Sequence, residues 1–323
     1  MTEKTTVALH LSVEESIPFL SILTIIGVTS FATNSLIIGI ICKNSRHGKI
    51  HDLFVLHSSL VDLLTACVVV PFWILSAIHS QIYFVGKVYC KVSATVSFVG
   101  MVAPVIFLSL VATSRHCSVV DRKAFPRIFS HSRSRLMVMV VWIVSILISL
   151  PPHFAWPLQR EEMRCLPDLI TNSWYTTAVL AFCVVLPLSA SFYTHIYDIF
   201  IGFQPERIKR DDSMRIRCGA VKRYALKGCE RTTQKAFFSI LIIHTCCWAP
   251  YTCVAMVQTM TGRKSFYLGN VPVHFIALVV GLTGTTLKGV VACFEVPYIK
   301  GLIKKQFGCA EREQNEENTS QEV

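Results

Sequence analysis

The chain has 323 residues, a formal net charge of +11 and a mean hydropathy of +0.51. Hydrophobic residues make up 52% of it and charged residues only 16%, which excludes a typical soluble protein of this size. The sequence therefore predicts an all-α membrane protein, and we interpret the basic charge as a topology signal rather than a nucleic-acid-binding surface.

Seven apolar stretches are long enough to cross a bilayer, which takes about 20 helical residues. Residues 1–16 precede them without a basic cluster or a small-residue cleavage site, so neither a removable signal peptide nor a ligand-binding outer domain is expected. We expect one seven-transmembrane helix bundle over residues 17–300. The predicted helices lie near residues 17–42, 52–78, 92–119, 135–157, 174–202, 235–260 and 271–299.

Most of the 31 Lys and Arg residues lie in the segments after the first, third, fifth and seventh helices. Because positively charged loops stay in the cytoplasm, the N-terminus is predicted outside the cell and the C-terminus inside. A short amphipathic cytoplasmic helix is predicted over 301–309, followed by a polar tail over 310–323. Cys309 is a palmitoylation candidate, and an unmodified cysteine fits the pattern equally well.

Two of the 13 cysteines fall on the predicted outer side, where a disulfide persists. Cys90 starts the third helix and Cys165 lies in the loop after the fourth, so a bridge between them would tie this loop across the mouth of the bundle. The sequence contains no P-loop, nucleophile elbow, metal-ligand spacing or internal repeat typical of a transporter. We therefore predict no enzyme activity, no cofactor and no metal site.

Characteristic residues follow one another along the predicted helices. The first helix carries ATNSLIIG with Asn34, the second carries LHSSLVDLL with Asp62, and Arg115 ends the third. Further along come Trp142, Pro187 and the CWAPY segment over 247–251. Over nearly the whole chain this order resembles the rhodopsin-like (class A) G-protein-coupled receptors, in an orphan-type form with divergent D-R-Y and N-P-x-x-Y motifs.

The resemblance implies a multi-pass protein of the plasma membrane, surrounded by lipid, that transmits an extracellular ligand signal or basal activity to a heterotrimeric G protein. Arg115 would be held by acidic partners at rest and released when the sixth helix swings outward. A guanidinium suits this role because it stays charged while it exchanges partners. The alternative is an orienting charge that snorkels to the membrane surface. The implied activation core is Asn34, Asp62, Trp248, Pro250 and Pro297.

The sequence departs from the family at the inner end of the third helix. Ser114 stands where the family has an acid beside the arginine, so one acidic partner of Arg115 is missing. Glu230 falls where the family often has the acid of the sixth helix, and a lock between Arg115 and Glu230 is expected. Because one of two acidic partners is absent, we predict raised ligand-independent signalling.

The end of the seventh helix departs further. A gap-free alignment of VPYIKGLIKKQFGC places Val296 at the asparagine of N-P-x-x-Y, Pro297 at the proline and Lys300 at the tyrosine. A second register places Tyr298 at the tyrosine, but then Glu295 replaces the proline. We favour the first register, because a proline explains a kink in the seventh helix.

Asp62 needs a partner, because a carboxylate in mid-span costs about 2.5 to 3.5 kcal/mol. In the family this aspartate holds a sodium ion together with a serine of the third helix and the asparagine of the seventh. Here the corresponding positions are Pro104 and Val296, so weak or absent sodium binding is expected. Asp62 is instead expected to be protonated or to form a hydrogen bond with Asn34.

The resemblance places the ligand in the outer half of the bundle. Ser97 stands where amine receptors carry an aspartate, so a cationic amine lacks its anchor. The lining suits a lipid, a small neutral molecule or the end of a peptide, and Pro71 and the mixed-charge QREEMRC segment favour a peptide weakly. The candidate lining is Ser97, Phe98, Met101, Trp248, Tyr251, Thr252 and Gln258.

Lys288 introduces another interpretation, because opsins carry a lysine in the seventh helix that forms a Schiff base with retinal. It reaches that position only in the second register, and Ser93 replaces a carboxylate at the counterion site, although Glu161 or Glu162 could approach it. We favour a structural lysine that reaches a polar partner. A channel or transporter would instead use Asp62 and Lys288 to line an ion path. A poorly coupling receptor-like protein, acting through partners or as a receptor dimer, also fits the altered motifs.

Overall fold

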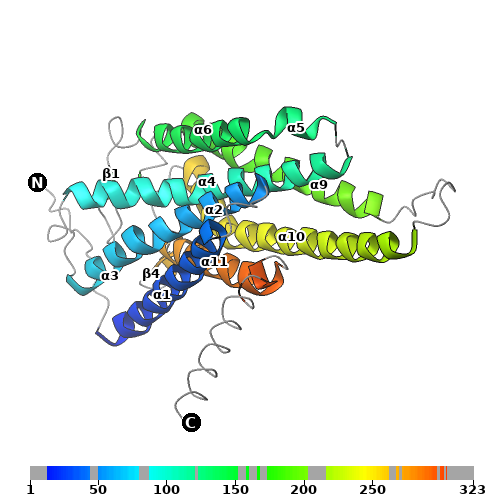
Figure 1. Cartoon of the computed structure of the whole chain (residues 1–323). Helices are drawn as coiled ribbons and strands as arrows, with labels where there is room; N and C mark the ends of the chain where they lie inside the picture. Colours follow the sequence, from blue (N-terminus) through cyan, green and yellow to red (C-terminus); the bar gives the residue numbers. More distant parts are fainter. Residues whose placement is uncertain are drawn as a thin grey trace, which may run out of the picture.

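A computed structural model describes residues 13–43, 50–79, 87–120, 123–151, 158–159, 166–167, 173–202, 216–261, 267–268, 271–296, 299–301 and 303. These residues are almost entirely helical (Figure 1). Within them, seven helices are long and apolar enough to cross a membrane. The prediction of an all-α seven-helix bundle is therefore confirmed.

The spans follow one another in chain order, and two of them are composite. The first, third, fourth, sixth and seventh spans are single helices: α1 (Val13–Lys43), α4 (Lys87–Val120), α6 (His131–Ser149), α10 (Ile216–Thr261) and α11 (Val273–Glu295). The second consists of α2 (Ile50–Leu64), η2 (Thr65–Val69) and α3 (Val70–His79). The fifth consists of α8 (Ser173–Val179), η5 (Leu180–Val185) and α9 (Leu186–Gly202).

Short elements lie in the connections between the spans. A one-turn helix, α5 (Phe125–Ile128), precedes α6. Two antiparallel pairs of two-residue strands flank the fifth and seventh spans: β1 (Leu158–Gln159) with β2 (Leu166–Pro167), and β3 (Tyr267–Leu268) with β4 (Val271–Pro272).

The composite spans contain π-helical turns, η2 and η5, each followed by a proline. Pro71 comes two residues after η2 and Pro187 two residues after η5. Proline has no N–H and its ring collides with the preceding turn of an α-helix, so a wider turn relieves the conflict. The Val70 N–H donates to the Thr65 carbonyl across this wider turn. A π-turn holds about one residue more than an α-helical turn. The side chains that follow it therefore face the bundle in a different register.

Several helix ends differ from the expected ones. The fourth span begins at His131, because the Ser130 hydroxyl caps it by accepting from the Arg133 N–H at 3.4 Å, and it ends at Ser149 before the prolines at 151–152. The sixth helix begins at Ile216, in a stretch rich in helix-forming Ala, Leu, Lys and Arg. The seventh ends at Glu295, since a proline follows two residues later. Beyond Glu295 the Lys300 N–H donates to the Val296 carbonyl at 2.9 Å and residues 299–301 are helical, so the expected kink at Pro297, which lies outside the described residues, stays a prediction.

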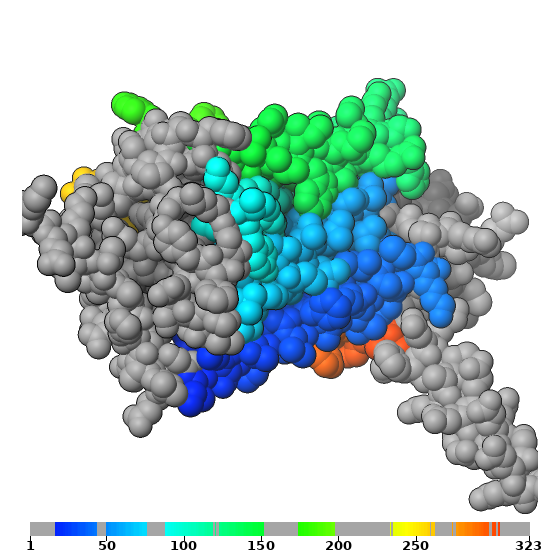
Figure 2. Space-filling model, turned by 90° about the vertical axis from the view of Figure 1, so that its left-hand side faces the viewer, coloured from blue at the N-terminus to red at the C-terminus, as the bar shows by residue number. Residues whose placement is uncertain are grey.

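The most buried span is α4, which packs against α2, α6 and α9, whereas α11 lies against α10 and α1. Figure 2 shows one face of the molecule, on which α1, α2 and α6 lie in successive bands. Trp142 joins two of these helices, because its indole N–H donates to His57 Nδ1 of α2 at 3.2 Å. The two ends of the bundle are marked by Cys90 and Arg115, which lie near opposite ends of α4 and give these ends their names.

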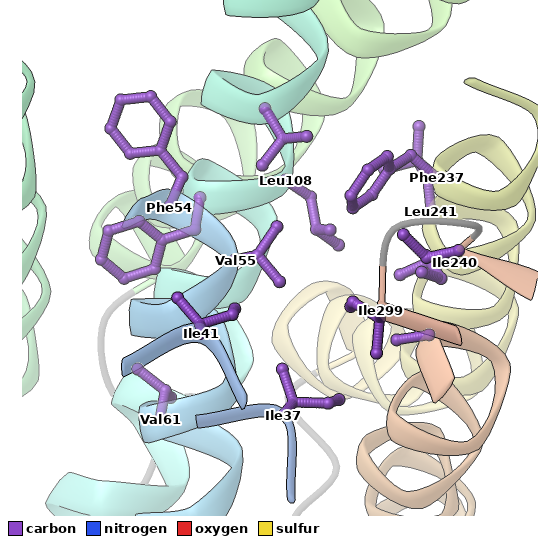
Figure 3. Close-up of a cluster of buried hydrophobic side chains, with 14 of the residues drawn as sticks. Ile37, Ile41, Phe54, Val55, Val61, Leu108, Phe237, Ile240, Leu241 and Ile299 are labelled. Carbon is purple, nitrogen blue, oxygen red and sulfur yellow. The ribbon is translucent and has the colours of Figure 1, made fainter. Parts of the chain in front are cut away.

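Two apolar clusters fill the bundle. One surrounds Trp248 in the half toward Cys90. The other fills the half toward Arg115, where side chains of α1, α2, α4 and α10 point toward one another (Figure 3). Its labelled members are Ile37, Ile41, Phe54, Val55, Val61, Leu108, Phe237, Ile240, Leu241 and Ile299. This second cluster fastens the sixth helix to the rest of the bundle at the Arg115 end.

Candidate functional site

Arg115 is half-buried near the end of α4 and faces the sixth helix. Its guanidinium carbon lies 5.0 Å from the centroid of the Phe237 ring of α10. A guanidinium over an aromatic face makes a cation–π contact, which here holds two helices together. Phe237 also belongs to the apolar cluster in Figure 3, so α10 meets Arg115 on an apolar surface.

Ser114 is fully buried and faces α2. Its hydroxyl donates to the Val111 carbonyl at 3.0 Å and lies 3.5 Å from His51 Nδ1. Ser114, which stands where rhodopsin-like receptors carry an acid, thus contacts the second span. Glu230 lies in α10, but its side chain is outside the described part of the structure. The expected lock between Arg115 and Glu230 stays a prediction.

Three further predicted site residues fall outside the described residues: Cys165, Pro297 and Cys309. Cys90 is buried at the start of α4 and forms a disulfide. Its pairing with Cys165 stays a prediction, as does palmitoylation of Cys309.

A buried ion pair joins the second and seventh spans. Lys288 Nζ of α11 lies 3.0 Å from Asp62 Oδ1 of α2, and both side chains are 4% exposed. The sequence offered Asn34 as a hydrogen-bond partner of Asp62, and the structure corrects that expectation. It confirms instead that Lys288 reaches a polar partner. Each charge satisfies the other in a region where an isolated charge would be costly.

Asn34 has a different role, which is to connect α1 with α11. Its amide donates to the Ser30 carbonyl at 2.9 Å and to the Ser30 hydroxyl at 3.3 Å, and that hydroxyl donates to Thr285 Oγ1 at 3.2 Å. Gly289 permits this close packing, because a Cβ there would lie 2.4 Å from Thr33 Oγ1 and 3.4 Å from the Asn34 amide nitrogen.

Trp248 is buried against α11 and carries two aromatic contacts along α10. A Cβ on Gly281 would lie only 2.9 Å from its indole ring, so the helices touch at this point. The Tyr251 ring meets it edge-on at 5.9 Å between centroids, and the His244 ring lies 6.4 Å from it. Pro250 lies within the same helix, one residue before Tyr251.

A cavity opens between the third, fifth and sixth spans in the half of the bundle toward Cys90. It is a narrow cavity that is partly open to the outside. Four residues named from the sequence line it: Phe98, Met101, Tyr251 and Thr252. Ser97, Trp248 and Gln258 are buried but are not part of this lining. The Ser97 hydroxyl donates to the Ser93 carbonyl at 2.8 Å within its own helix.

Sequence reasoning missed the wall that the fifth span and the last turns of α10 contribute. It consists of Tyr175, Thr176, Val179, Leu180 and Ala255. Only Pro187 marked the fifth span in the sequence, and the π-turn before it changes which residues face inward.

Comparison with known proteins identifies the family of this bundle. A family model described as "7 transmembrane receptor (rhodopsin family)" matches residues 33–283, which is most of the chain. The chain belongs to this receptor family. It is therefore a rhodopsin-like G-protein-coupled receptor, a multi-pass membrane protein of a family of receptors rather than enzymes.

Curated relatives of the receptor include melatonin receptors type 1B. Those of Mus musculus and Homo sapiens are each 24% identical to it, over 74% and 76% of this chain and 64% and 65% of the relatives. A melanopsin-like protein of Danio rerio is also 24% identical, over 78% of this chain and 51% of that protein. The aligned part thus spans 51 to 65% of the length of these relatives.

Among solved structures, the crystal structure of squid rhodopsin matches the receptor with a TM-score of 0.77. The match covers 91% of this chain and 87% of that one, at 17% sequence identity. The likeness supports the fold, which is the rhodopsin-like arrangement of helices.

Proposed function

We propose that this receptor responds to a neutral aromatic small molecule in the cavity and activates a heterotrimeric G protein at the Arg115 end. We place it in the plasma membrane with the N-terminus outside and the C-terminus in the cytoplasm. One observation supports the proposal above all: α10 carries both a wall of the cavity, through Tyr251 and Thr252, and Phe237, which contacts Arg115. A movement of one helix therefore reaches both ends.

The lining of the cavity indicates the chemistry of its ligand. None of its described side chains is charged, and Phe98, Tyr175 and Tyr251 offer aromatic surfaces. Two hydroxyl donors are already used within the protein, since Thr252 donates to the Ala249 carbonyl at 2.9 Å and Tyr175 donates to the Ile148 carbonyl. The Thr252 oxygen retains acceptor capacity. The lining thus favours an uncharged aromatic molecule with an N–H or O–H donor over a cationic amine.

Melatonin is the first probe, because the relatives of this receptor bear that name. We expect Ala255→Phe, which fills the cavity, to abolish binding of the probe. Met256→Phe on the exposed side of the same helix should leave binding unchanged. Radioligand binding to membranes measures both. Equal loss in the two variants would contradict this cavity as the site, and a panel of neutral aromatic molecules that binds nowhere would contradict the ligand class.

Signalling is tested by G-protein activation in membranes at matched surface expression. We expect the wild-type receptor to show basal activity, Arg115→Ala to reduce it to background and Ser114→Asp to reduce it about fivefold. An added carboxylate beside the guanidinium would stabilise the resting state, and a fivefold change corresponds to about 1 kcal/mol. Ser114→Asn is the neutral control and should keep the wild-type activity. Unchanged activity in Ser114→Asp would refute the idea that the missing acid raises basal signalling. No activation of any G-protein class by any variant would favour a poorly coupling receptor-like protein.

Sodium is expected to have no effect on ligand binding or on basal activity. The Lys288 ammonium already contacts the Asp62 carboxylate at 3.0 Å, so the site carries its own cation. Exchange of sodium for potassium at constant ionic strength measures the effect. A clear sodium dependence that Asp62→Asn removes would contradict this expectation.

The opsin interpretation receives no support from the position of Lys288. Its ammonium is engaged by Asp62, and it is not part of the described lining of the cavity. A free amine in the ligand cavity is what a Schiff base with an aldehyde would need.

A further inference from the structure

His244 is a buried polar side chain that is not part of the described lining of the cavity. It lies on α10, one helical turn before Trp248, and is 1% exposed. Within the described part of the chain, neither of its ring nitrogens has a hydrogen-bond partner in good geometry, and the backbone of Met101 is the nearest candidate. A buried polar group of this kind calls for a specific explanation.

The surroundings of His244 suggest which group it can bind. A Cβ on Gly284 of α11 would lie 2.9 Å from Cys247 Cβ of α10. Because these consecutive spans run in opposite directions, Lys288, one turn beyond Gly284, lies near His244, one turn before Cys247. The backbone of Met101 in α4 lies beside the ring. A neutral imidazole has one donor and one acceptor nitrogen. If the donor nitrogen faces the Met101 carbonyl, the other nitrogen is free to accept a hydrogen bond from a cation.

Lys288 is able to provide that hydrogen bond without a movement of its helix. An ammonium has three donors on a flexible four-carbon stem, and the hydrogen bond to Asp62 uses one of them. The backbone of α11, in contrast, is fixed on both sides, where Gly281 touches Trp248 and Gly289 touches Thr33. A change of partner is therefore a side-chain rotation.

We propose that Lys288 is a two-position switch between Asp62 of α2 and His244 of α10. In the structure it occupies the Asp62 position, which is favoured at rest because two buried opposite charges attract strongly. In the His244 position the ammonium donates to the imidazole. The seventh span then exchanges its hydrogen bond to the second span for one to the sixth span.

The cavity connects to this switch through contacts along α10. Tyr251 lines the cavity and packs on Trp248, and Trp248 packs on His244. A ligand that displaces Tyr251 would thereby reposition the imidazole toward Lys288. This last step rests on the proposed function, whereas the two positions of Lys288 do not.

Thermal unfolding in detergent tests the switch independently of signalling. In the Asp62→Asn background Lys288 loses its carboxylate and turns to His244, so the imidazole becomes important only there. We expect His244→Phe alone to leave the unfolding midpoint within about 1 °C of wild type. We expect the same change in Asp62→Asn to lower the midpoint by a further 2 to 4 °C or so, the shift expected for the loss of about one hydrogen bond to a charge.

Two controls make the result specific. Asp62→Asn/His244→Gln keeps an acceptor and should unfold near Asp62→Asn. In Asp62→Asn/Lys288→Met no ammonium remains, and adding His244→Phe should change the midpoint by less than about 1 °C. Additive effects of Asp62→Asn and His244→Phe, or an equal loss with glutamine, would overturn the switch. Basal signalling of the same variants is read separately, and silence there would count against the proposed function alone.

Discussion

Lys288→Met is expected to lower the free energy of unfolding of the receptor by about 3 to 5 kcal/mol, the cost of leaving one member of a buried ion pair uncompensated. Asp62 would then remain 4% exposed in mid-span without its cation. The double variant Asp62→Asn/Lys288→Met removes both charges and should recover most of the loss. Unfolding of the detergent-solubilised receptor by heat or denaturant measures these differences.

Lys91→Met is the matched control, because Lys91 lies on the exposed surface of α4. It should change the stability by no more than about 0.5 kcal/mol. If Lys288→Met were as mild as Lys91→Met, or if the double variant were less stable than both single variants, the ion pair would not support the bundle.

The second large effect is expected at Gly289. Gly289→Ala should destabilise the receptor by about 1 to 3 kcal/mol, because the added methyl group would lie 2.4 Å from Thr33 Oγ1 and 2.9 Å from Thr33 Cβ. Thr33 is held by hydrogen bonds from its hydroxyl to the carbonyls of Thr29 and Ser30, at 2.8 and 3.4 Å. Relief requires the first and seventh spans to separate.

The same substitution in α1 should have the opposite sign. Gly39→Ala adds a methyl group where no atom lies within 4 Å, and it should stabilise the helix by about 0.4 to 1 kcal/mol. Comparison of the two midpoints isolates packing from helix propensity. A stabilising Gly289→Ala would show that α1 and α11 are less closely packed than the structure describes.

The fold was predictable because hydropathy alone determines where a bilayer-spanning helix can form. The ends of the helices were less predictable, since they depend on local chemistry such as the Ser130 cap and the proline after Glu295. The partner of Asp62 was missed for a different reason. Counting along the family motif compares aligned positions such as Val296, and it does not show that the long side chain of Lys288, eight residues earlier, reaches Asp62.

The candidate site was predictable where a motif marks a position, and only there. Phe98, Met101, Tyr251 and Thr252 lie on spans with recognisable markers and do line the cavity. The wall from Tyr175 to Leu180 has no such marker, because a π-turn shifts the inward face by an amount that periodicity does not reveal. The ion pair did leave a signal, namely two opposite charges at the centres of two apolar spans.

The length of α10 has a mechanical consequence. At 1.5 Å per residue its 46 residues extend about 69 Å, more than twice the hydrocarbon thickness of a bilayer. From Pro250 to Ile216 the helix is roughly 50 Å long, so a tilt of about 10° at the proline would displace the far end by about 9 Å. The sixth helix is then a lever with unequal arms, in which a sub-ångström adjustment beside the cavity becomes a displacement large enough to open or close a docking surface for another protein.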